Sequence, residues 1–183
     1  ATEPLQERVA AELERLSMPG ASLEVVLEPH PDGYGPSGRE TVELRVAPNP
    51  GIEAAPLRDA ASGGELSRVM LALSGLGRAA SAPTMVFDEI DAGVGGNTAR
   101  VVGERLRALG RDRQVLCITH LPQVASLADV HFRLEKDVTG EQARATVERL
   151  DGEGVVAEIR RMLGGESSDE AATRHARELL AAA

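Results

Sequence analysis

Two adjacent carboxylates, Asp88 and Glu89, directly follow the segment Thr84–Phe87, which contains the short apolar run Met85–Phe87. Such a run is typical of a buried strand in a parallel sheet, and α/β sheets bind ligands beyond the carboxyl ends of their strands. There the first carboxylate can hold Mg²⁺, usually through water, and the second can accept a proton from an attacking water molecule. Either residue alone is also compatible with the start of a solvated loop, so the pair has to be weighed with its neighbouring motifs.

A second motif, Ser62-Gly63-Gly64-Glu65, stands immediately before a segment with helical periodicity. The N-terminus of a helix presents free backbone N–H groups and the positive end of the helix dipole, which together attract phosphate. Ser62 and Glu65 also have the spacing of a capping box, which needs no ligand. The motif by itself therefore leaves phosphate binding and simple helix capping open.

A third motif is Thr119-His120, which ends the apolar run Val115–Ile118. If this run is a parallel neighbour of 84–87, His120 lies at the same sheet edge as the acid pair. An imidazole in that place can hydrogen-bond a terminal phosphate, although a lone histidine at a strand end usually has no such role. Glycines 93, 95 and 96 form a loop after the acids, and the G-x-G-x-x-G dinucleotide fingerprint is absent.

The remaining periodicity predicts the elements that hold these motifs in place, in an α/β layer with helices and antiparallel strands. Residues 5–16 have heptad-like helical spacing that Met18-Pro19-Gly20 ends, and alternating residues predict antiparallel strands at 23–27 and 42–46. A helix is expected from about residue 65, with its apolar face formed by Leu66, Val69, Met70, Leu73 and Leu76. The other expected elements are a helix bearing Val102, Leu106 and Leu109, strands at about 131–135 and 143–149, a helix at 155–163 ending at Gly164, and a last helix that a Ser167/Glu170 capping box begins.

Composition narrows the class of protein. A net charge of −9 over 183 residues argues against a surface that coats nucleic acid, and the arginines at 105–113 are more typical of a solvated helix end. Cys117 is the one cysteine, so no internal disulfide can form, and its apolar neighbours indicate a buried, inert thiol. No apolar run approaches the roughly 20 residues that cross a bilayer, and no signal peptide is recognisable. We therefore expect a soluble, intracellular protein without a membrane partner.

Taken together, the order of the three motifs resembles the second half of an ABC ATPase. Residues 88–96, D-E-I-D-A-G-V-G-G, are similar to the SMC-like branch of that superfamily. Residues 61–73, 118–125 and 161–165 extend the resemblance, which is closest to the RecN family of bacterial DNA-repair proteins and covers the chain from Ala10 onward. A RecF-like or cohesin-like head is the alternative within this branch, and the loop at 93–96 favours the RecN family.

The resemblance implies an α/β fold, the C-terminal half of a P-loop ATPase head. Residues 1–17 would be the foot of a coiled-coil helix and residues 18–183 the C-terminal lobe. Ser62, Gly63, Gly64 and Glu65 would form the signature motif, which contacts the γ-phosphate of ATP held by a second head. The resemblance further implies Asp88 as the support for Mg²⁺, probably through water, Glu89 as the residue that polarises the water, and His120 as the switch histidine.

The sequence departs from the superfamily pattern in three places. Ala61 replaces the usual leading leucine of the signature, and the aspartate common in the D-loop of transporters is absent near Gly95. A Walker A loop is also missing, because the one lysine, Lys136, has no glycine run before it. The chain alone should therefore be inactive and should need the N-terminal lobe of the same polypeptide.

The resemblance implies ATP and Mg²⁺ as cofactors and an ATP-dependent dimer of heads as the active form. Double-strand break repair in the bacterial cytoplasm, in association with the nucleoid, would be the function, and DNA would be bound through the full-length protein. The alternative from another class is a structural or interaction lobe without turnover. Glu89 counts against that alternative, because a purely structural lobe needs no base beside a metal site.

Overall fold

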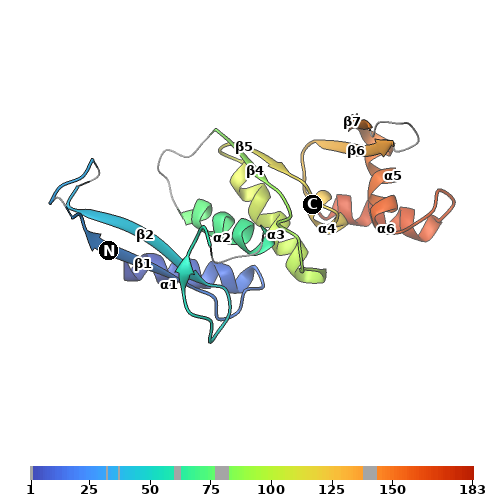
Figure 1. Cartoon of the computed structure of the whole chain (residues 1–183). Coiled ribbons are helices and arrows are strands. Elements are labelled where there is room, and N and C mark those ends of the chain that lie inside the picture. Colours follow the sequence, from blue (N-terminus) through green and yellow to red (C-terminus); the bar gives the residue numbers. More distant parts are fainter. Residues whose placement is uncertain (1, 32, 37, 60–62, 77–82, 138–143) are drawn as a thin grey trace. The chain divides into compact units, whose positions relative to one another are not determined.

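The computed structural model describes residues 2–31, 33–36, 38–59, 63–76, 83–137 and 144–183 (Figure 1). Two compact units divide the chain, residues 1–118 and residues 119–183. Among the described residues, no helix has the length and apolar character needed to cross a bilayer. The acid pair and the described part of the signature segment belong to the first unit, and His120 belongs to the second.

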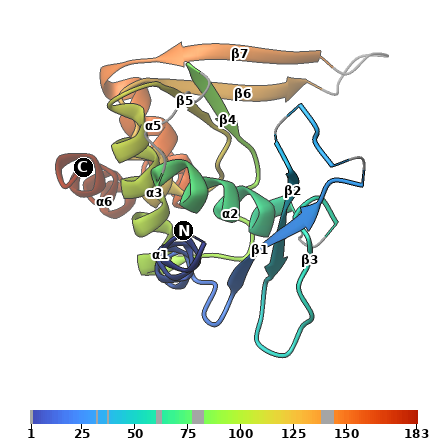
Figure 2. The same cartoon turned by 90° about the vertical axis from the view of Figure 1, so that its left-hand side faces the viewer.

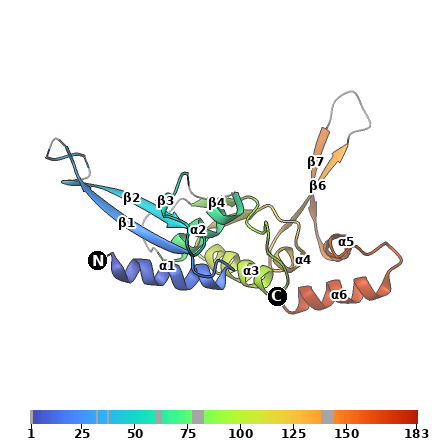
Figure 3. The same ribbon diagram turned by 60° about the horizontal axis from the view of Figure 1, so that its bottom comes forward.

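The first unit begins with helix α1, Glu3–Arg15, which runs along an antiparallel sheet (Figure 3). Strand β1, Ser22–Pro29, pairs with β2, Glu40–Ala47, as predicted, and the short β3, Ala55–Pro56, pairs with the other side of β2. The heptad-like positions of α1 pack on this unit, because Val9, Leu13 and Leu16 have no exposed surface. The pair Leu23 and Val46 is buried beneath them.

Helices α2, Gly63–Leu76, and α3, Gly96–Gly110, complete the layer of helices in the first unit (Figure 2). The predicted face of α3 is confirmed, since Val102, Leu106 and Leu109 are buried. The predicted face of α2 is wrong in part: Met70 is exposed, and the buried residues are Gly64, Arg68, Val69, Leu71 and Ala72. The buried face is rotated because α2 packs between α1 and α3 and also faces the loop that follows β4.

Strands β4, Thr84–Phe87, and β5, Gln114–Cys117, form the predicted parallel pair, in the register Thr84 to Gln114 through Phe87 to Cys117. Helix α3 connects them and contacts β5. The expectation that both strands are fully buried is wrong. Alternate side chains project from the other face of the sheet, where Val86, which is 63% exposed, lies beside its register partner Leu116, which is also exposed. Ile118, just after β5, is 61% exposed. The described residues of the unit cover one face of this sheet.

The described residues of the second unit form a hairpin and three helices. Strands β6, His131–Asp137, and β7, Arg144–Leu150, pair antiparallel, as the sequence predicts. The short α4, Pro122–Ala125, contacts both α5, Gly152–Met162, and α6, Glu170–Ala181. Gly164, with φ of 81°, follows the end of α5, as predicted. The capping box at Ser167 is wrong: Asp169 caps α6 instead, accepting a hydrogen bond from Ala172 N at 2.9 Å, because the helix starts two residues later.

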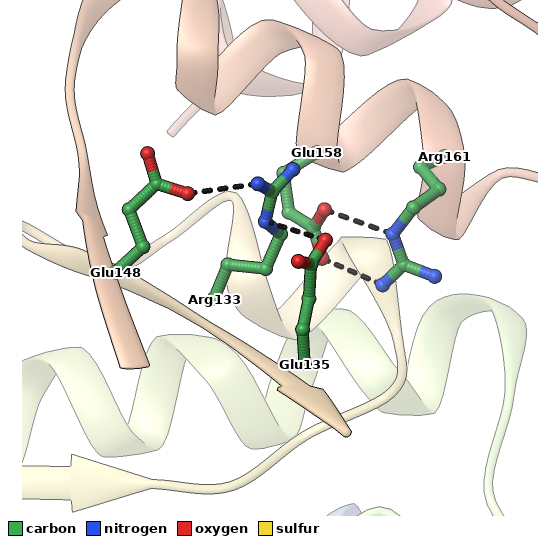
Figure 4. A network of polar contacts seen from close by, with 5 residues as sticks. All are labelled: Arg133, Glu135, Glu148, Glu158 and Arg161. Atoms are coloured by element: carbon green, nitrogen blue, oxygen red, sulfur yellow. Dashed lines mark hydrogen bonds and ion pairs between the residues drawn. The ribbon is translucent and has the colours of Figure 1, made fainter. Parts of the chain in front are cut away.

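One face of the β6–β7 hairpin carries an ionic network beside α5 (Figure 4). Arg133 joins Glu148 on the opposite strand at 2.8 Å and Glu135 on its own strand at 3.2 Å. In α5, Arg161 donates two hydrogen bonds to Glu158, which lower the pKa of that carboxyl below its ordinary value. The hairpin's other face carries the exposed side chains of Phe132, Leu134 and Val147, and Arg149 stands opposite Phe132 on the same face.

Candidate functional site

The N-terminus of α2 lies against the acid pair of the same unit. Gly63 is exposed and Gly64 is buried. A β-carbon on Gly64 would come within 2.9 Å of Glu89 O and 2.8 Å of Ala92 Cβ, so only glycine permits this approach. The expected signature serine, Ser62, and its capping interaction with Glu65 lie outside the described residues. The structure thus places Gly64, of the expected signature segment, against the backbone that follows Asp88, and Gly63 against the side chain of Glu89.

Asp88 and Glu89 are exposed at the carboxyl end of β4, the position predicted from the sequence. Glu89 has φ of 55°, a left-handed conformation that non-glycine residues seldom adopt. It costs about 1–3 kcal/mol and persists only where the surrounding structure holds it. Its carbonyl accepts a hydrogen bond from Ala92 N at 3.0 Å, which closes a turn. Strained backbone of this kind concentrates at functional sites, so Glu89 is the prominent candidate in the first unit.

The carboxylate of Glu89 points toward the N-terminus of α2. A β-carbon on Gly63 would lie 2.8 Å from Glu89 Oε2. A negatively charged group is favourable beside the positive end of a helix dipole, in the place where a phosphate would also be attracted. The resemblance assigns Glu89 and the signature glycines to different nucleotides, yet the structure brings them together within one chain.

Two side chains of α2 donate hydrogen bonds to the segment after β4, and neither was predicted to be functional from the sequence. Ser67 Oγ donates to Asp88 O at 2.8 Å. The guanidinium of Arg68 donates through Nη1 to Ala92 O at 2.8 Å and to Ile90 O at 3.4 Å. A signal existed in the sequence: Gly64 and Ala72 stand four residues before and after Arg68, so one helix face alternates small residues with an arginine.

The interior beside the acid pair is unfavourable for additional charge. Asp91 is buried, and Cys117, at the end of β5, is half-buried rather than fully buried as expected. Burial, followed by the negative charges of Asp91 and Asp88, raises the pKa of the Cys117 thiol from 9.0 to about 12. The thiol therefore stays protonated near neutral pH and is a poor nucleophile, which agrees with the inert role predicted for it.

The predicted switch histidine, His120, lies in the second unit, where it is exposed at the start of the segment that leads into α4. The neighbouring Thr119 accepts a hydrogen bond from Leu121 N at 3.0 Å through its hydroxyl, which shapes this turn. The association of His120 with the acid pair stays a prediction.

The donor set of the first unit matches part of a Mg²⁺ site. The described residues contain no cluster of three or more histidine, cysteine, aspartate or glutamate side chains able to enclose a metal. Mg²⁺ typically keeps several waters and is held by one or two carboxylates together with the phosphates of its substrate. The exposed Asp88 and Glu89 fit this incomplete kind of site, which a phosphate-bearing ligand would complete.

Comparison with known proteins identifies the family, although no family model matches the chain. "DNA repair protein RecN" of Streptomyces coelicolor is 45% identical over 192 residues, and that of Deinococcus radiodurans is 48% identical over 181 residues. Each match covers 98% of this chain, but only 34% and 31% of the respective relatives. The chain thus spans about a third of the length of these curated relatives.

A solved structure supplies the fold. The Smc head domain with a coiled coil and joint derived from Pyrococcus yayanosii matches with a TM-score of 0.58 and 25% identity, covering 87% of this chain and 29% of that one. This likeness, together with the observed helices and strands, confirms the predicted α/β fold. With 45 and 48% identity to RecN proteins over nearly its whole length, the chain belongs to the RecN family and has the fold of the C-terminal lobe of an SMC-type head.

Proposed function

We propose that this chain is one half of an ATP-hydrolysing head in a longer RecN-type protein that acts in DNA double-strand break repair. The observation that carries the proposal is the juxtaposition of the glycines at the start of α2 with Asp88 and the strained Glu89. A phosphate-attracting helix end beside paired carboxylates suits phosphoryl transfer, in which catalysis rests on positioning and charge stabilisation. Membership in the RecN family supports the biological setting.

Each residue of the acid pair has a separate role in this proposal. Asp88 would orient a Mg²⁺ ion through water, and the ion would neutralise charge on the phosphates when bound. Glu89 would accept a proton from the attacking water, a role that its exposed side chain permits. His120 would hydrogen-bond the terminal phosphate and so report its presence.

The signature segment would act on a nucleotide held by a second head. Ser62, Gly63, Gly64 and Glu65 would direct the N-terminus of α2 at that γ-phosphate. The Glu89 carboxylate lies over Gly63, so the N-terminus of α2 already has an acidic group of its own chain beside it. This position supports the proposal that the phosphate bound there belongs to the nucleotide of a second head. An incoming phosphate would replace the Glu89 carboxylate there and leave it free to face the nucleotide of its own head.

The exposed face of the β4–β5 sheet supports an N-terminal lobe as the partner within the same polypeptide. Parallel sheets are ordinarily covered on both faces, yet Val86, Leu116 and Ile118 lie exposed on this one. Because the relatives are about three times as long as the chain, a lobe carrying the Walker A lysine has room in the remaining sequence. The net charge of −9 favours DNA contacts made elsewhere in the full-length protein, in the bacterial cytoplasm at the nucleoid.

Replacing Glu89 by glutamine in the full-length protein tests the proposal. The amide keeps the shape but accepts no proton, so turnover should fall by a factor on the order of 10² or more while ATP binding and ATP-dependent dimerisation persist. Glu104→Gln on α3, whose carboxylate pairs with Arg100 at 3.0 Å, is the matched control and should leave turnover unchanged. Near-normal turnover in Glu89→Gln would instead favour the structural-lobe alternative.

The chain alone should neither bind ATP tightly nor hydrolyse it, because it has no Walker A loop. Titration calorimetry with Mg-ATP should show no heat of binding. Micromolar affinity of the isolated chain would contradict a site divided between two lobes.

A further inference from the structure

The starting observation is a buried arginine in the middle of α2. Arg68 is only 6% exposed, and arginine is almost never buried unless its guanidinium is paired. No carboxylate forms an ion pair with it among the described residues, and its Nη1 donates to the carbonyl oxygens of Ala92 and Ile90. Burial lowers the pKa of Arg68, and the nearby charge of Glu65 opposes that shift. The guanidinium thus directs its Nη1 to backbone carbonyls, while its buried Nε has no hydrogen-bond partner among the described residues.

The neighbouring serine extends this contact to the acid pair itself. Ser67 Oγ donates to Asp88 O at 2.8 Å, so two consecutive side chains of α2 hold three carbonyls between residues 88 and 92. These carbonyls lie on both sides of Glu89 and orient the peptides that flank it. Hydrogen bonds from a charged donor are stronger than those between neutral groups, so those of Arg68 can offset the cost of the left-handed backbone at Glu89.

We infer that Arg68 and Ser67 are positioning residues, which hold Glu89 in its strained conformation and tie it to the signature helix. This inference rests on the proposed function, since it concerns the same base. The two side chains form the α2 clamp, defined as Ser67 and Arg68 with the carbonyls of Asp88, Ile90 and Ala92. Through the clamp, a phosphate that meets the N-terminus of α2 and the orientation of Glu89 influence one another.

Hydrogen exchange of backbone amides in the full-length protein tests the clamp without reference to turnover. The amides of Ala92 and Val94 bond to Glu89 O and Asp91 O within the clamped segment. In Arg68→Met, which keeps the aliphatic bulk, these amides should exchange at least about tenfold faster, reflecting loss of the charged hydrogen bonds. Arg113→Met is the matched control, because Arg113 contacts Met85 Sδ at 3.7 Å and no carbonyl of the segment. Exchange as slow as in the wild type would overturn the inference.

Turnover provides the second readout. Misplacement of a reacting group by about 1 Å can cost 10²-fold, so Arg68→Met should lower kcat by roughly 10- to 100-fold while KM for ATP changes less than about threefold. Arg68→Lys should regain part of the protection and of kcat, because an ammonium can reach one carbonyl but not the geometry of a guanidinium. A lysine variant no better than methionine would contradict positioning by hydrogen bonding.

The outcomes separate the two proposals. If Glu89→Gln abolishes turnover and Arg68→Met hydrolyses ATP normally, the clamp does not position the base and the proposed function stands. If Glu89→Gln hydrolyses ATP normally, the proposed function fails, and exchange in Arg68→Met still decides whether the clamp holds the segment. Should Arg68→Met fail to fold, Ser67→Ala removes a single hydrogen bond; it should speed exchange of the same amides, and unchanged exchange would overturn the inference.

Discussion

The carboxylate of Glu89 lies over Gly63, so close that a β-carbon on Gly63 would stand 2.8 Å from Oε2, whereas a β-carbon on Gly64 would meet the carbonyl of Glu89. The two adjacent glycines therefore face the same residue in different ways. A side chain can rotate away at little cost, but a clamped backbone cannot. This difference allows steric effects on the carboxylate to be separated from effects on the fold.

The first prediction compares Gly63→Ala with Gly64→Ala. Gly63→Ala should change the free energy of unfolding by less than about 0.5 kcal/mol, because the Glu89 side chain can move aside. Gly64→Ala should destabilise the chain by about 1–3 kcal/mol, because its methyl group overpacks against backbone and Ala92. Urea denaturation of both variants measures the difference. Equal destabilisation would mean that Glu89 is held as rigidly at its carboxylate as at its carbonyl.

The second prediction concerns the action of the signature segment across a dimer. Ser62→Arg should leave ATP binding to single heads intact but abolish ATP-dependent dimerisation and hydrolysis, because a bulky cation blocks approach of the γ-phosphate. Mixing these heads with heads whose Walker A lysine is replaced should restore part of the turnover, since one intact composite site forms. Ser62→Ala distinguishes simple capping, which would cost about 1 kcal/mol of stability and little activity. No recovery at any mixing ratio would count against the trans role.

The third prediction follows from the pKa of Cys117, which burial and two aspartates raise to about 12. Because the thiolate is the reactive form, labelling by a maleimide at pH 8 should be at least about 100-fold slower in the folded chain than in urea. A raised thiol pKa contributes stability that is complete below the unfolded value near 9 and is lost as pH rises toward 12. Cys117→Ser should flatten this alkaline loss. Equal labelling rates in both states would show that the thiol is not protected.

The fourth prediction concerns Glu158, whose pKa is lowered chiefly by its hydrogen bonds from Arg161. A depressed carboxyl pKa gives stability that is present above the unfolded value near 4.5 and is lost as pH falls through the folded value. Because Arg161 is largely exposed, Glu158→Gln should cost only about 0.5–1 kcal/mol at neutral pH. It should also weaken the acid dependence of unfolding, whereas Glu166→Gln at an exposed position should not. An identical acid profile in both variants would refute this assignment.

Local pattern was sufficient for much of the fold. The alternation at 23–27 and 42–46 specified an antiparallel pair, and the apolar runs before Asp88 and Thr119 specified the parallel strands β4 and β5. The location of Asp88 and Glu89 at the carboxyl end of β4 could be predicted in the same way, because residues that directly follow a strand in the sequence must lie at its end. Where periodicity alone decided, as at the apolar face of α3, the expectation is confirmed.

Other features of the site depend on contacts between segments that are distant in the sequence, and these could not be predicted from local pattern. An arginine in an amphipathic helix is ordinarily solvated, and the burial of Arg68 arises only because carbonyls 22 and 24 residues away accept its hydrogen bonds. The approach of Glu89 to Gly63 has the same origin. The exposure of Val86 likewise cannot be deduced from an apolar run, which is equally compatible with one covered face or two. The sequence by itself determined the identity of the reactive groups and their order along the chain, since these are encoded locally, while the tertiary structure decided which backbone groups hold Glu89, since packing between distant segments creates those partners.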